Sequence, residues 1–107
     1  MPKASIKGSL TVCMRAGRLR LGMDEVKSAV RQKTVYGVIT ASDISKKSLK
    51  EIAYCCGRED VPLYSAQMTA DEIGAALGKV YAVIGVADRG FMGSMEKSLE
   101  KINYSKE

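Results

Sequence analysis

Short β-branched runs alternate with helical apolar stripes along almost the whole chain of 107 residues. Residues 35–40, 61–65 and 80–87 form apolar runs that are too short to be typical helices. Each run predicts a buried strand, and the run at 80–87 is expected to be central. Strands that alternate with helices are typical of a sheet covered on both faces. The pattern therefore predicts an α/β protein, folded as a three-layer α/β/α sandwich.

The predicted helices are marked by apolar spacings of three and four residues and by residues suited to cap their ends. Ser45 can cap one helix, and Thr69 with Glu72 fits the capping-box pattern of another. Gly17 and Gly78 stand where a helix can end. The apolar stripes are Ile6, Leu10, Cys13 and Met14; Val26, Ala29 and Val30; Leu49, Ile52, Ala53 and Cys56; Ile73, Ala76 and Leu77; and Phe91, Met95, Leu99 and Ile102. Residues 103–107 are expected to fray. Because there is no repeat, low-complexity tract or linker, residues 1–107 are expected to form a single domain.

Positive charge is concentrated in the first half of the chain. Residues 1–50 hold eleven Lys and Arg against three acids, whereas residues 51–107 hold six against nine. The net charge of +5 is enough to keep a protein soluble, but solubility does not explain this polarisation. A cationic surface is therefore predicted on the part of the fold that residues 1–50 build.

Several classes of protein are excluded by what the sequence lacks. No apolar run is long enough to span a bilayer, and residues 1–5 lack the apolar core of a secretion signal, so a cytoplasmic protein with no membrane partner is expected. Cys13, Cys55 and Cys56 are spaced as neither a zinc site nor a disulfide framework, and histidine is absent. We expect mostly buried thiols in a reducing compartment, and neither a metal nor a cofactor.

Catalysis has few suitable groups. Histidine, the commonest general base, is missing, and the adjacent Asp24 and Glu25 would diverge by about 100° on a helix. Cys56 lies on an apolar stripe, which indicates burial rather than reactivity. Met23 and Asp24 stand where a phosphate-binding loop needs Lys and Ser or Thr. An enzyme is therefore not expected.

The segment 15–30 joins an arginine-rich approach to a helix start. Arg18 and Arg20 precede Gly22, and Asp24 and Glu25 fall in the first helical turn, where acidic side chains suit the helix dipole. The free N–H groups of a helix start can donate to phosphates or base edges. This combination indicates nucleic-acid recognition, although a capped surface helix with solvated arginines explains the segment equally well. The aromatic residues are scattered and form no stacking platform, so RNA shape and a helix-end contact would have to provide recognition.

Several motifs in order resemble the ribosomal-protein family of kink-turn RNA binders (the L-seven-Ae type, in the L-thirty-e-like superfamily), in particular its small bacterial branch. The resemblance runs from about Leu10 to Phe91. It is carried by Arg15-Ala16-Gly17-Arg18, Leu21-Gly22, Glu25, Ala29-Val30, Val38-Ile39-Thr40-Ala41-Ser42-Asp43, Val61-Pro62-Leu63, Ile73-Gly74-x-Ala76-x-Gly78-Lys79 and Ala82-Val83-Ile84-x-Val86-x-Asp88-x-Gly90-Phe91. The resemblance implies a mixed four-stranded sheet between helix layers and binding of sharply bent RNA with tandem sheared G·A pairs.

In that family a Gly-Thr-Asn-Glu-x-x-Lys segment at the start of the second helix enters the widened groove of the RNA. Carried over to this chain, Gly22 and Glu25 match the family, Met23 stands for threonine, Asp24 for asparagine, and Ser28 for lysine. An ionised Asp24 only accepts hydrogen bonds, and Ser28 lacks the charge of lysine. A second loop, apolar in the family and covering an extruded base, corresponds here to Lys79 and Val80.

The predicted function is therefore non-catalytic binding of structured, kink-turn-like RNA, with the ribosome as a candidate partner and no specificity for DNA. Phosphate contacts are predicted for Arg18, Arg20, Lys27 and Arg31, and the segment 22–25 is expected to approach the bases. Two alternatives remain: a protein-interaction module on the same fold that has lost specific RNA binding, and an enzymatic or small-molecule use of the fold.

Overall fold

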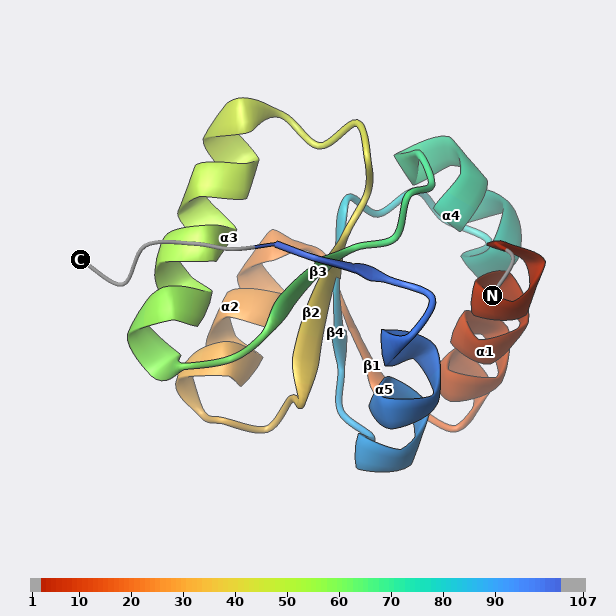
Figure 1. Cartoon of the computed structure of the whole chain (residues 1–107), viewed down its shortest axis with the longest axis horizontal. Coiled ribbons are helices and arrows are strands. Elements are labelled where there is room, and N and C mark those ends of the chain that lie inside the picture. Colours follow the sequence, from red (N-terminus) through yellow and green to blue (C-terminus); the bar gives the residue numbers. More distant parts are fainter. Residues whose placement is uncertain (1–2, 103–107) are drawn as a thin grey trace.

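Helices cover both faces of a mixed sheet in the computed structural model (Figure 1), which describes residues 3–102, with side chains from residue 6 onward. The expected fraying of residues 103–107 lies outside the described residues. The elements in chain order are α1 (Lys3–Arg15), β1 (Leu19–Leu21), α2 (Met23–Arg31), β2 (Gly37–Thr40), α3 (Lys46–Glu59), β3 (Leu63–Ser65), α4 (Ala70–Leu77), β4 (Val83–Val86), α5 (Arg89–Glu96) and β5 (Glu100–Lys101).

The strands lie in the order β1-β4-β2-β3-β5. Strands β2 and β3 are parallel, and every other neighbouring pair is antiparallel. All residues of β2 and β4 are buried, as expected for strands with helices on both sides. The strand expected to be central, β4, is an interior strand, and β2 beside it occupies the middle of the sheet.

Two helix layers enclose the sheet, with α2 and α3 on one face and α1, α4 and α5 on the other (Figure 1). Alternate strand residues point into the two cores, as the two-residue period of a strand requires. Val38 and Val83 pack with α2 and α3, whereas Ile39 and Ile84 pack with the three other helices. The predicted α/β/α sandwich is confirmed.

The predicted caps are also present. The Ser45 hydroxyl accepts a hydrogen bond from the Ser48 N–H at 3.1 Å, and Thr69 and Glu72 form both bonds of the capping box. Gly78 ends α4 with a φ of 85°, a left-handed conformation that glycine adopts without strain. The local sequence therefore sets where α3 and α4 begin and where α4 ends.

The last helix is shorter than predicted. It ends at Glu96, and the expected stripe residues Leu99 and Ile102 lie beyond it. The chain turns instead and crosses the sheet edge, where β5 pairs with β3 and the Ile102 N–H donates to the Leu63 carbonyl at 2.8 Å. Ile102 thereby packs against the core of α2 and α3, on the opposite side of the sheet from α5. This two-residue strand makes the sheet five-stranded rather than four-stranded.

Candidate nucleic-acid interface

The start of α2, the start of α3 and the loop of residues 78–82 lie together at one edge of the sheet. Strands β1 and β2 are both antiparallel to β4, so they run in the same direction, and each leads into a helix. Helices α2 and α3 therefore begin at the same edge, which we call the helix-start edge. Strand β4 begins there too, so the loop of residues 78–82 before it also lies at this edge.

Gly22 shapes the start of α2. Its φ of 89° and ψ of 158° are rarely adopted by residues with a side chain, and nothing lies within 4 Å of where a Cβ would stand. Its N–H donates to the Val83 carbonyl at 3.1 Å, which ties the helix start to the end of the 78–82 loop. The glycine thus serves the backbone conformation and leaves open space beside the first turn of α2.

The two acids of that first turn differ in their surroundings. One carboxylate oxygen of Glu25 accepts a hydrogen bond from the Leu21 N–H at 2.8 Å, whereas Asp24 is exposed and makes no hydrogen bond with the residues described. Met23 is half-buried and packs against the core of α2 and α3. Glu25 therefore already has a structural role, joining the first turn of α2 to β1, although no side-chain hydrogen bond caps the helix at Gly22.

Strand β1 is an outermost strand of the sheet, so one side of its backbone has no neighbouring strand, and side chains cover part of that side. Leu19 and Leu21 direct their backbone groups away from β4, because the bonded positions alternate along an antiparallel pair. Glu25 accepts from the Leu21 N–H, and the Arg20 guanidinium donates to the Leu19 carbonyl at 3.1 Å. Arg20, Glu25 and Ser28 also line a shallow hollow of about 300 Å³ beside β1.

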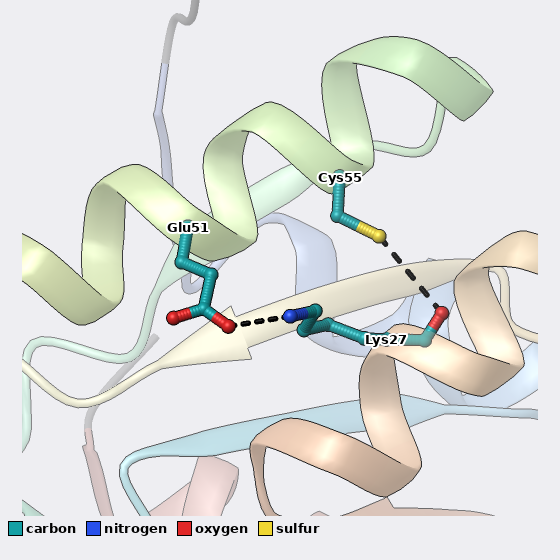
Figure 2. A network of polar contacts seen from close by, with 3 residues as sticks. All are labelled: Lys27, Glu51 and Cys55. Carbon is teal, nitrogen blue, oxygen red and sulfur yellow. Dashed lines mark hydrogen bonds and ion pairs between the residues drawn. The ribbon is translucent and has the colours of Figure 1, made fainter.

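Lys27 faces the other way, toward α3. Its ammonium group forms an ion pair with Glu51, and its backbone carbonyl accepts a weak hydrogen bond from the Cys55 thiol at 3.9 Å (Figure 2). The side chain of Lys27 is 20% exposed and that of Glu51 is 42% exposed. The hydrogen bond from Lys27, together with its charge, lowers the pKa of Glu51 below its ordinary value. A residue predicted to contact phosphate thus also links α2 to α3.

Arg31 lies at the far end of α2, about 12 Å along the helix from Met23 at 1.5 Å per residue. Together with Lys27 and seven residues of α3 it lines a groove of about 580 Å³ between the two helices. The α3 residues in this groove are Lys47, Lys50, Glu51, Tyr54, Cys55, Arg58 and Glu59. Apart from Cys55, which was predicted to be a buried thiol, none of them was singled out from the sequence. Their spacing along 47–59 nevertheless places them on one helical face.

The second predicted loop also lies at the helix-start edge. Val80 is 57% exposed, unusual for a valine, and Lys79 is exposed beside it. A Cβ on Gly74 would lie 3.0 Å from a methyl carbon of Val80 and 3.3 Å from its Cα. Gly74 therefore lets the loop rest against α4.

The remaining arginine, Arg18, lies at the opposite end of β1, where its carbonyl accepts from the Ala87 N–H at 2.8 Å. The predicted residues therefore fall into four places. Gly22, Met23, Asp24, Glu25, Lys79 and Val80 lie at the helix-start edge; Arg20 and Ser28 line the hollow beside β1; Lys27 and Arg31 line the α3 groove; and Arg18 stands apart.

The three cysteines are buried and unpaired, as predicted. Burial raises the pKa of Cys13 to about 11 and that of Cys56 to about 12, so both thiols stay protonated at neutral pH. Over residues 3–102, no group of three His, Cys, Asp or Glu side chains could hold a metal ion. No helix in the same range has the length and apolar character needed to cross a membrane.

Comparison with known proteins places this geometry in a family. A model of the ribosomal protein L7Ae/L30e/S12e/Gadd45 family matches residues 4–93. The large ribosomal subunit protein eL30 of Sulfolobus acidocaldarius is 27% identical over 88 residues, which span 80% of this chain and 85% of that protein. A solved structure of a protein with unknown function from Bacillus halodurans C is 30% identical with a TM-score of 0.80, covering 86% of this chain and 93% of that one. The chain therefore belongs to the L7Ae/L30e/S12e/Gadd45 family of ribosomal-type, RNA-binding proteins.

Proposed function

We propose that this protein is a non-catalytic RNA-binding protein that recognises sharply bent, kink-turn-like RNA, such as that of the ribosome, through the helix-start edge. The observation that carries the proposal is the meeting of two features at this edge. The open start of α2 at Gly22 and the exposed Val80 loop are joined through the hydrogen bond from Gly22 to Val83. In the family that the chain resembles, the corresponding segments are those that enter the RNA groove and cover an extruded base.

In this proposal each part of the edge has a separate task. The N–H groups at the start of α2 and the free oxygen of Glu25 meet base edges, and Val80 covers an unstacked base. Arg20 and Lys79 flank the contact and meet phosphates. The ammonium group of Lys27 is already paired with Glu51, so a phosphate would have to share it with that carboxylate.

Two residues of the proposed site should make RNA binding weaker than the family pattern implies. The negative charge of Asp24 repels phosphates, and Ser28 supplies no charge where a lysine is expected. We expect Ser28→Lys to strengthen binding of a kink-turn duplex. Absence of any gain would mean that α2 does not dock as the family pattern implies.

A gel-shift titration at 50 and 200 mM salt tests the proposal, with a kink-turn duplex and a plain duplex of equal length as probes. We expect preference for the kink-turn and a fall in affinity of orders of magnitude at the higher salt, because several phosphates are neutralised. Glu25→Ala should reduce the preference. Glu100→Ala is the matched control, because Glu100 is an exposed acid on β5, which three other strands separate from β1.

Two results would contradict the proposal. Equal affinity for the two duplexes would remove the kink-turn specificity. No binding of either duplex at 50 mM salt would remove RNA binding and favour a protein-interaction module on this fold.

A further inference from the structure

The groove between α2 and α3 starts at the helix-start edge and shares only Lys27 with the proposed kink-turn site. It has a volume of about 580 Å³, within the roughly 300–1,000 Å³ range of ligand-binding clefts. Lys47, in the first turn of α3, stands at the helix-start edge, and Arg58 lies near the other end of the helix. The groove therefore leads from the proposed RNA site along the outer helix layer.

The groove is strongly cationic. Its lining holds five basic side chains against two acidic ones, and one of the acids, Glu51, is already paired with Lys27 (Figure 2). Lys47, Lys50 and Arg31 are exposed and form no ion pair within residues 3–102. An acidic ligand therefore meets uncompensated positive charge along both helices.

An aromatic ring lies among these charges. Tyr54 is 61% exposed, and the guanidinium of Arg58 lies 5.9 Å from the centroid of its ring. An exposed tyrosine beside an arginine provides a surface on which a base stacks in sequence-independent binding of single strands. An acidic peptide would use the charges but not this ring, so the pair favours nucleic acid over protein.

We propose that the groove between α2 and α3 binds single-stranded RNA, with a base stacked on Tyr54 and phosphates lying along Lys47, Lys50 and Arg31. The inference rests on the proposed function, because the strand would continue from a bent RNA held at the helix-start edge. Lys47, Lys50 and Tyr54 have no part in the proposed kink-turn contact, so the two sites are tested separately.

Fluorescence anisotropy with three probes tests the proposal: a kink-turn duplex, the same duplex with a single-stranded extension, and an oligouridine. We expect the extension to increase affinity. Tyr54→Ala should remove this gain, weakening the extended probe roughly 5- to 150-fold while leaving the unextended duplex unchanged. Tyr36→Ala is the matched control, because Tyr36 is 52% exposed and lies outside the groove.

The lysines have a separate readout. Replacing both Lys47 and Lys50 by alanine should lower the slope of log affinity against log salt by about 1.4 for the oligouridine. Lys97→Ala combined with Lys101→Ala removes the same charge from exposed positions outside the groove and should leave the slope unchanged.

The outcomes separate this inference from the proposed function. An extension that adds no affinity, or equal effects of Tyr54→Ala and Tyr36→Ala, would overturn the groove as a single-strand site. In a competition experiment, a polyglutamate peptide could displace the oligouridine equally well from the wild type and from Tyr54→Ala. That result would also overturn the groove as a single-strand site. If the kink-turn duplex fails to bind, the proposed function falls, and oligouridine binding that depends on Tyr54 still supports the groove.

Discussion

Replacing Glu25 by alanine should destabilise the fold as well as weaken RNA recognition, because this carboxylate has a structural partner. It accepts a hydrogen bond from the Leu21 N–H at 2.8 Å and lies in the first turn of α2. A hydrogen bond of this kind contributes about 0.5–1.5 kcal/mol at an exposed site. Its charge near the positive end of the helix dipole adds about 0.3–1 kcal/mol. The expected loss in the free energy of unfolding is therefore about 1–2 kcal/mol.

Asp24 is the matched control for this prediction. It precedes Glu25 in the same turn, carries the same charge and makes no hydrogen bond with the described residues. Asp24→Ala should lose only the dipole contribution of about 0.3–1 kcal/mol. The difference between the two variants therefore isolates the bond to Leu21, at about 1 kcal/mol.

Urea denaturation at neutral pH measures both variants, and thermal unfolding checks them. A difference of about 1 kcal/mol corresponds to roughly 4 °C in Tm for a domain near 100 residues. High salt should reduce the loss in Asp24→Ala more completely than the loss in Glu25→Ala, since only the dipole contribution is fully screened. Free energies of unfolding that agree within about 0.3 kcal/mol for the two variants would refute the structural role of Glu25.

Three further predictions concern stability. Ile52→Ala opens a cavity at a fully buried position between α3 and the sheet and should cost about 2–5 kcal/mol by urea denaturation, and a loss below about 1 kcal/mol would contradict that packing. Thr69→Ala removes the hydroxyl that accepts from the Glu72 N–H at 3.1 Å and should cost about 1 kcal/mol, whereas wild-type stability would show that the cap is dispensable. Because burial raises the pKa of Cys56 from 9.0 to about 12, stability should be fully present below pH 9 and fall as the pH rises from there, since unfolded thiols ionise first. In Cys56→Ala the loss of stability at alkaline pH should be smaller. Identical profiles of stability against pH in the variant and the wild type would contradict the raised pKa of Cys56.

The sequence predicts those parts of the fold whose determinants are local. The capping box of Thr69 and Glu72 is contained in four consecutive residues, and the buried strands β2 and β4 are apolar runs. Strand β5 carries no such signal, because Glu100 and Lys101 are polar and exposed and pair with β3 only after the chain has turned at the end of α5. Its formation depends on the unpaired edge of β3, which no local pattern encodes.

The candidate site shows the same division. The helix start at Gly22 was predicted because glycine, acids and periodicity coincide within one segment. The ion pair of Lys27 with Glu51 joins residues 24 positions apart, so only the packing of α2 on α3 reveals it. Lys47 and Lys50 contribute to the charge of residues 1–50, but they line a groove only because α2 lies beside α3.

The way Glu25 and Arg20 cover the outer rim of β1 has a consequence for self-association. Exposed rims of sheets recruit further strands, and that is a common route to aggregation. Here a carboxylate occupies the Leu21 donor and a guanidinium occupies the Leu19 acceptor, so an incoming strand would have to displace both. A ligand that draws the Glu25 carboxylate toward itself uncovers the donor again. Recognition of that ligand and protection against sheet extension therefore depend on the same carboxylate.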